Sequence, residues 1–282
     1  MFESIGRSLA LVRTSWNILM EDKKLLAFPI LSGIVTIAVI IAFILPLLLT
    51  NSISAVSGAN PVLTLVLLFL FYVVSYFVVI FFNTALISCV NARIQGKPMS
   101  VGEGLSVATR HFGSILAWAV ISATVGLILH LISERAGFIG QIIIGLVGGV
   151  WSLITYFVVP ILVLEDKGVV DSVKDSVTLI RKTWGESIIG AGSIMIIFVL
   201  IGIVAFLGVI GAIFTGNTIL IGVAVVLFLL LIAVLAVVGS AMQGIFVTAL
   251  YTYAKTGTVP SAFNPDLIRN AFVPKQVGPG NI

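Results

Sequence analysis

The sequence predicts an all-α polytopic membrane protein of about six transmembrane helices, and three observations support this fold class. Of the 282 residues, 60% are hydrophobic and only 9% are charged, whereas soluble domains carry roughly 25% charged residues. The hydrophobic residues form runs long enough to cross a bilayer, which takes about 20 helical residues. Nearly all ionisable residues lie between these runs. A soluble fold is therefore excluded.

Six hydrophobic runs qualify as spans. They cover residues 25–49, 61–90, 114–131, 138–164, 188–214 and 218–254. The second and sixth runs are longer than one crossing requires, so we expect these helices to continue beyond the hydrocarbon region or to tilt. Pro46 and Pro160 lie inside two of the runs and are expected to kink them.

The positive charges predict the orientation of the spans. Of the 15 Lys and Arg residues, all except Arg135 lie before the first run, after the sixth, or in the second and fourth connections. Cytoplasmic loops collect Lys and Arg, so both termini are expected in the cytoplasm. The basic residues are spread over several short segments, which suits an anionic inner leaflet and excludes nucleic-acid binding.

The cytoplasmic segments share an amphipathic pattern. Hydrophobic residues recur every three or four positions at the N-terminus and in segments 100–112 and 169–184. This spacing predicts helices that lie in the headgroup plane. Ser100 and Glu103 have the spacing of a capping box, which predicts a helix start at that position.

We interpret the chain as one transmembrane domain, residues 1–282, with internal repeats. Residues 82–86 (FNTAL) are similar to residues 246–250 (FVTAL). The predicted repeat is an interfacial helix, an outward span, a turn and an inward span. The repeats cover residues 1–97, 98–167 and 168–257. Residues 258–282 are left as a C-terminal interfacial helix and tail.

Aromatic and basic residues occur where the predicted interfacial helices meet their spans. Trp and Arg favour this depth in any membrane protein, so anchoring is the first interpretation. Binding of lipid headgroups is the alternative. The candidate headgroup contacts are Arg13, Trp16, Arg110, Arg181 and Trp184.

Few polar residues lie within the spans. Those that stand out could hydrogen-bond across a helix interface, worth about 1 kcal/mol, or line a cavity. These candidates are Tyr72, Tyr76, Asn83 and Gln243. Gly145 and Gly149 form a GxxxG pair, which is typical of close helix packing within a chain or of self-association.

The sequence contains no catalytic or cofactor motif. His111 and His130 are expected near opposite faces of the membrane, so they cannot share a metal ion. There is no HExxH or CxxC motif and no phosphate-binding glycine loop. No span carries a carboxylate at mid-membrane, as an ion-driven transporter would. We therefore predict no enzymatic activity, no cofactor and no metal.

Two segments carry a resemblance to a known family. Residues 8–16 (SLALVRTSW) with 25–33 (LLAFPILSG), and later residues 181–185 (RKTWG), resemble an uncharacterised family of prokaryotic multi-pass membrane proteins, known as a domain of unknown function. The resemblance implies a bacterial or archaeal inner-membrane location and no particular activity. A weaker likeness extends to the membrane domain of glycerophosphodiester phosphodiesterases, whose catalytic domain is absent here.

Two functions remain open at this point. Helices poor in polar residues favour a scaffold, assembly factor or accessory subunit of a membrane complex. The alternative is a transporter or lipid-handling protein with a cavity between the helical hairpins. The expected partners are the lipid bilayer and either other membrane proteins or a second copy of the chain.

Overall fold

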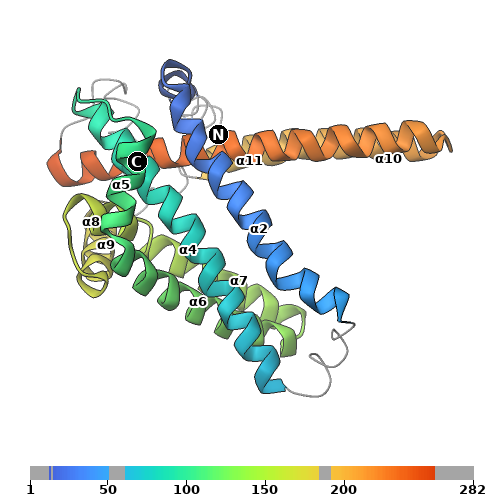
Figure 1. The fold of residues 1–282 in the computed structure, drawn as a ribbon, viewed down its shortest axis with the longest axis horizontal. Helices are drawn as coiled ribbons and strands as arrows, with labels where there is room; N and C mark the ends of the chain where they lie inside the picture. The colour runs from blue at the N-terminus through green and yellow to red at the C-terminus, as the bar shows by residue number, and fades with distance from the viewer. Residues whose placement is uncertain (1–12, 14, 51–60, 184–191, 258–282) are drawn as a thin grey trace, which may run out of the picture. The chain divides into compact units, whose positions relative to one another are not determined.

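The structure is a computed structural model that describes residues 13, 15–50, 61–183 and 192–257. Trp184 and the predicted C-terminal helix and tail lie outside the described residues. Within the described ranges there are helices and no strands (Figure 1). The helices are η1 (Lys23–Leu26), α2 (Ala27–Leu49), α4 (Pro61–Ile94), α5 (Val101–Arg110), α6 (Phe112–Arg135), α7 (Phe138–Ile154), α8 (Val158–Leu164), α9 (Val169–Thr183), α10 (Gly192–Phe214) and α11 (Thr218–Thr256).

The predicted fold class is confirmed. Five helical segments are long and apolar enough to cross a membrane: Lys23–Leu49, Pro61–Ile94, Phe112–Arg135, Phe138–Leu164 and Thr218–Thr256. The remaining predicted span corresponds to α10, which has 23 residues. The helices of the second and sixth spans are longer than one bilayer crossing requires, since α4 has 34 residues and α11 has 39.

The chain divides into two compact units. The α4 unit is Ala27–Ile180, and the α11 unit is Met1–Leu26 with Arg181–Ile282. The repeats predicted from the sequence, with boundaries after residues 97 and 167, stay a prediction.

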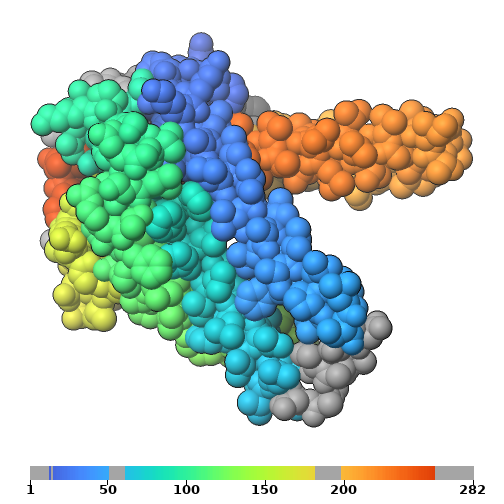
Figure 2. Space-filling view, in the orientation of Figure 1, coloured from blue at the N-terminus to red at the C-terminus, as the bar shows by residue number. Residues whose placement is uncertain are grey.

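Helix α4 is the centre of the α4 unit. It packs against α2, α5, α6 and α8, and in the space-filling view it lies between α2 and α6 (Figure 2). Residues 84–90, near its end, are all buried. Among the described elements, α7 has appreciable contact only with α6. None of the residues of α7 is buried.

Helix α5 packs against the neighbouring helices at one end of this unit. Its N-cap, Ser100, accepts a hydrogen bond from the Glu103 backbone N–H at 3.3 Å, and the Glu103 carboxylate accepts one from the Ser100 backbone N–H at 2.6 Å. The capping box is thus confirmed. Gly104 and Ala108 form the buried side of the helix, and Gly104 packs against Phe28 of α2 and Ala85 of α4.

The capping box makes the stability of α5 depend on pH. Hydrogen bonds from the Ser100 backbone and hydroxyl lower the pKa of Glu103 below its ordinary value of 4.5. A lowered pKa gives stability that is present above the ordinary pKa and is lost as pH falls through the lowered value. We expect Glu103→Gln, which keeps the acceptor without the charge, to flatten the pH dependence of thermal unfolding in the acid range. An unchanged acid limb in Glu103→Gln would contradict this assignment.

Contacts between ionisable side chains hold the α8–α9 connection at the same end. Nε2 of His111, at the α5–α6 junction, lies 3.2 Å from an Asp166 carboxylate oxygen. The Lys167 ammonium pairs with Asp175 of α9 and, at 2.9 Å, with Glu165. Its hydrogen bonds to Asp175 and Glu165 raise the pKa of Lys167. The start of α2, the end of α4, α5, and the α8–α9 connection therefore share one end, which we call the α5 end.

In the α11 unit, α10 and α11 form a hairpin with a tight turn. Asn217 caps α11, its side-chain oxygen accepting from the N–H groups of Ile219 and Leu220. Gly202 and Gly239 face the partner helix, since a Cβ atom on either would make an ordinary contact with it, 3.5 Å from Ile232 and 3.6 Å from Phe198. Helix α11 ends at Gly257, which adopts the left-handed conformation with φ of 69° that glycine allows without strain.

Candidate ligand-binding cavity

A cavity of about 450 Å³ lies between α4, α6 and α7 in the α4 unit. We call it the tyrosine–tryptophan cavity. Its lining residues are Tyr76 and Ile80 of α4, Trp118, Ser122, Val125, Gly126 and Leu129 of α6, Gly148, Trp151 and Ser152 of α7, and Thr155. The lining contains no charged residue.

Aromatic side chains form one side of this cavity. Trp118 and Trp151 stack across the α6–α7 interface with ring centroids 6.0 Å apart and planes 26° apart. Tyr76 reaches toward α6 over Gly126, where a Cβ atom would lie 3.1 Å from the Tyr76 hydroxyl. A glycine at position 126 therefore leaves the room that the tyrosine occupies.

Hydroxyl groups supply the polar side of the cavity. Thr155 donates to the Trp151 carbonyl at 2.7 Å. Among the described residues, the hydroxyls of Tyr76, Ser122 and Ser152 have no hydrogen-bond partner. Ser122 is nevertheless only 7% exposed. Tyr76, at 39%, and Ser152 are exposed. Hydroxyls that line a cavity can donate and accept hydrogen bonds, so these three can bind a polar group that enters it.

The helix that forms the third wall is broken beside the cavity. Helix α7 ends at Ile154 and α8 starts at Val158. Pro160 explains the break, because proline has no N–H and its ring clashes with the carbonyl four residues earlier. The kink expected at Pro160 is therefore present as an interruption.

Ser176 of α9 satisfies the backbone groups that the break leaves free. Its hydroxyl donates to the Ile154 carbonyl at 2.7 Å and accepts from the Phe157 N–H at 3.1 Å. Phe157 is fully buried, as is Ser176. Non-helical backbone is tolerated at membrane depth only where such groups are satisfied. Helix α9 thus fixes the wall that carries Ser152 and Thr155.

The candidate polar residues of the spans are placed differently from one another. Tyr76 lines the cavity. Tyr72 lies next to it, with ring centroids 6.4 Å from Tyr76 and 6.3 Å from His130. Asn83 is half-buried on α4 and Gln243 is exposed on α11, and neither lines a cavity described here. A role for these two in helix contacts stays a prediction.

The candidate headgroup contacts that the structure describes are on the surface. Arg13, Arg110 and Arg181 are exposed, and Trp16 is 42% exposed. Trp184 lies outside the described residues. These positions are open to lipid headgroups, and their binding stays a prediction.

Gly145 and Gly149 do not pack within the described chain. A Cβ atom on either would have nothing within 4 Å, so the pair lies on the open side of α7. Of the two interpretations of the GxxxG pair, packing within the chain has no contact among the described residues to support it, and self-association stays a prediction. The neighbouring Gly148 instead faces the cavity, 3.8 Å from Leu129.

Several cavity residues were missed at the level of sequence. Trp118, Ser122, Trp151 and Ser152 were not singled out, nor was Ser176. A usable signal does exist: small or polar residues at positions 122 and 126 of one span, and 148 and 152 of the next, are four apart and share a helix face. Within the described ranges, no three His, Cys, Asp or Glu side chains are placed to hold a metal ion.

The fold and the cavity define a multi-pass, all-α membrane protein with a weakly polar, open cavity between α4, α6 and α7. The chain belongs to a family of unknown function, DUF6159, whose sequence profile matches residues 62–261. The expected uncharacterised multi-pass family is thereby confirmed. A search of curated proteins gives no match. The likeness to the membrane domain of glycerophosphodiester phosphodiesterases finds no support in these comparisons.

Proposed function

We propose that the protein is a non-catalytic membrane protein that binds a lipid or a similar amphipathic molecule in the tyrosine–tryptophan cavity. The observation that carries this proposal is a cavity of about 450 Å³ with unpaired hydroxyls beside indole and aliphatic walls. Ligand pockets are typically about 300–1,000 Å³, mostly apolar, with a few polar groups that fix orientation. The cavity therefore favours the lipid-handling alternative.

The lining also limits the chemistry of the ligand. Serine and tyrosine hydroxyls both donate and accept hydrogen bonds, and an indole N–H donates. A charged group would lose its hydration in the cavity without meeting an opposite charge. The inserted part of the ligand is therefore neutral, such as a hydroxyl, an ester or an amide attached to an apolar chain.

We further propose that the α5 end faces the cytoplasm, with both termini inside and the protein in an inner membrane. The basic connections lie at one end of the α4 unit. They are held there by the packing of α5, by the His111–Asp166 contact and by the ion pairs of Lys167. Basic segments stay on the cytoplasmic side. In this orientation α5 and α9 are the interfacial helices.

Gly148 and Gly149 provide a matched pair of variants to test ligand binding. Gly148→Leu places its side chain in the cavity past Leu129, whereas Gly149→Leu points into open space on the same helix. We expect wild type, purified in a mild detergent, to retain one amphipathic species at a near-equal ratio, measured by mass spectrometry. Gly148→Leu is expected to retain about tenfold less, a loss of about 1.4 kcal/mol in binding, and Gly149→Leu as much as wild type.

The control variant also shows where a retained molecule binds. Equal retention in wild type and Gly148→Leu, with both folded by circular dichroism, would rule out binding in this cavity. Equal losses in both variants would show that the bound species covers the outer surface of α7 rather than the cavity.

A second candidate is a scaffold or accessory subunit, and the open face of α7 favours it. Gly145 and Gly149 let another helix approach closely, and nothing in the described chain fills that space. If this function holds, wild type should cross-link in native membranes to a stoichiometric protein partner or to a second copy of the chain. Gly145→Leu should abolish that cross-link. Identical cross-links in Gly145→Leu and wild type would argue against it.

A further inference from the structure

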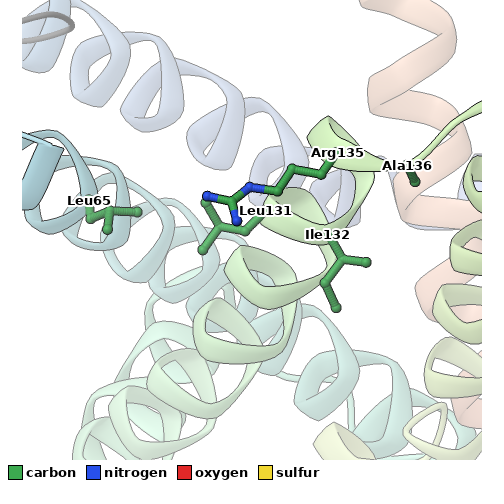
Figure 3. Close-up of a pocket in the computed structure, with 5 residues that line it drawn as sticks. All are labelled: Leu65, Leu131, Ile132, Arg135 and Ala136. Atoms are coloured by element: carbon green, nitrogen blue, oxygen red, sulfur yellow. The ribbon is translucent and has the colours of Figure 1, made fainter.

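A second cavity lies at the end of the α4 unit opposite α5. It has a volume of about 480 Å³ and is lined by Leu65 of α4, by Leu131, Ile132 and Arg135 of α6, and by Ala136. Arg135 is the last residue of α6. Its guanidinium extends beside Leu131 toward Leu65, so that one positive charge lies over an apolar wall (Figure 3).

The Arg135 charge has no acidic partner among the described residues. The neighbouring Glu134 carboxylate lies 3.2 Å from Nε2 of His130, one helical turn earlier. The connection that precedes α4, residues 51–60, contains no Asp or Glu. A guanidinium without a carboxylate binds phosphate well, because its planar fork matches two phosphate oxygens.

This site is separate from the tyrosine–tryptophan cavity. The two cavities share no lining residue, because residues 118–129 of α6 line the first and residues 131–135 line the second. Each cavity therefore has its own level along the helix, and a change in one does not fill the other.

We propose that Arg135 binds the phosphate of a phospholipid, with an acyl chain lying over Leu65, Leu131 and Ile132. The end of an apolar helix of 24 residues lies at the depth of the headgroups. The basic α5 end is at the other end of the same helix, so this lipid belongs to the opposite leaflet. The site is distinct from the headgroup contacts expected at Arg13, Arg110 and Arg181.

The test uses two lipids that differ only in the headgroup. Delipidated full-length protein in detergent is titrated with phosphatidylglycerol or with a diacylglycerol of the same chains, and bound lipid is counted by native mass spectrometry. We expect Arg135→Gln to weaken phosphatidylglycerol binding about tenfold and to leave diacylglycerol binding unchanged. Arg135→Lys should retain part of the affinity, because lysine keeps the charge without the planar fork.

Lys97→Gln is the charge-matched control, since Lys97 is exposed in the connection next to α5. It should bind phosphatidylglycerol as wild type does; a loss equal to that of Arg135→Gln would overturn the site in favour of non-specific attraction. Unchanged binding in Arg135→Gln would also overturn it. Displacement of the lipid by inorganic phosphate alone would identify free phosphate as the ligand and contradict the lipid proposal. Gly148→Leu should keep this binding, so the two proposals can fail separately.

Discussion

Gly104→Ala is expected to separate α5 from α4 and to lower the free energy of unfolding by about 1–3 kcal/mol, the usual effect of overpacking. A Cβ atom at this position would lie 2.5 Å from Sγ of Cys89, 3.0 Å from the Ala85 carbonyl oxygen and 3.0 Å from Cζ of Phe28. A backbone carbonyl inside a long helix cannot move aside as a flexible side chain can. The helix that carries the new methyl group must shift instead.

Gly102→Ala is the matched control on the same helix. A Cβ there has nothing within 4 Å, and alanine is favoured over glycine in helices by about 1 kcal/mol. The two substitutions should therefore change stability in opposite directions. Cys89 gives a direct measurement, because it is 3% exposed beneath α5 and is the only cysteine. Maleimide labelling should accelerate in Gly104→Ala and not in Gly102→Ala. Equal labelling in the two would contradict the packing of α5 on α4.

Ser176→Ala is expected to destabilise the protein by about 1–3 kcal/mol, the cost of leaving buried partners unsatisfied. The substitution removes the hydroxyl that bonds both the Ile154 carbonyl and the Phe157 N–H. The matched control is Thr178→Ala, two residues further along α9, whose exposed hydroxyl bonds only the Lys174 carbonyl of its own helix. Thermal unfolding in detergent should show a clear loss for the first variant and little change for the second.

A substitution at Pro160 tests why the Ser176 hydroxyl is needed. If Ser176 is needed because proline interrupts the helix, Pro160→Ala should let residues 155–157 regain helical bonds and reduce that need. The double variant Pro160→Ala/Ser176→Ala should then be more stable than the sum of the single effects allows. Strict additivity would show that Ser176 stabilises the protein for some other reason.

The fold could be predicted largely from local signals. Hydrophobic runs of about 20 residues or more define the spans, and the Ser100–Glu103 spacing defines the start of α5. The face that α9 buries could not be predicted in this way. The hydrophobic spacing of segment 169–184 predicted an amphipathic helix but did not single out Ser172 and Ser176, which are fully buried. The reason is a backbone need created at Pro160 in another element.

The cavity was less predictable than the fold. In a span that is apolar all round, periodicity does not say which side faces its neighbours. Tyr76 was identified because it is polar, whereas Trp118 and Trp151 were not distinguished from other apolar residues. The GxxxG spacing pointed to Gly145 and Gly149, yet the glycine of α7 that faces the cavity is Gly148. Only the packing of α4, α6 and α7 selects it.

The most direct test of ligand binding is photo-cross-linking from inside the cavity. A small diazirine side chain replaces Ser152, which lines the cavity, or Gly149, which faces open space. Cells are irradiated, and the adducts are identified by mass spectrometry. If the cavity binds a specific amphipathic molecule, position 152 will yield one species enriched over the bilayer, while position 149 will yield lipids in proportion to membrane composition. The same distribution of adducts at both positions would contradict a ligand-binding cavity.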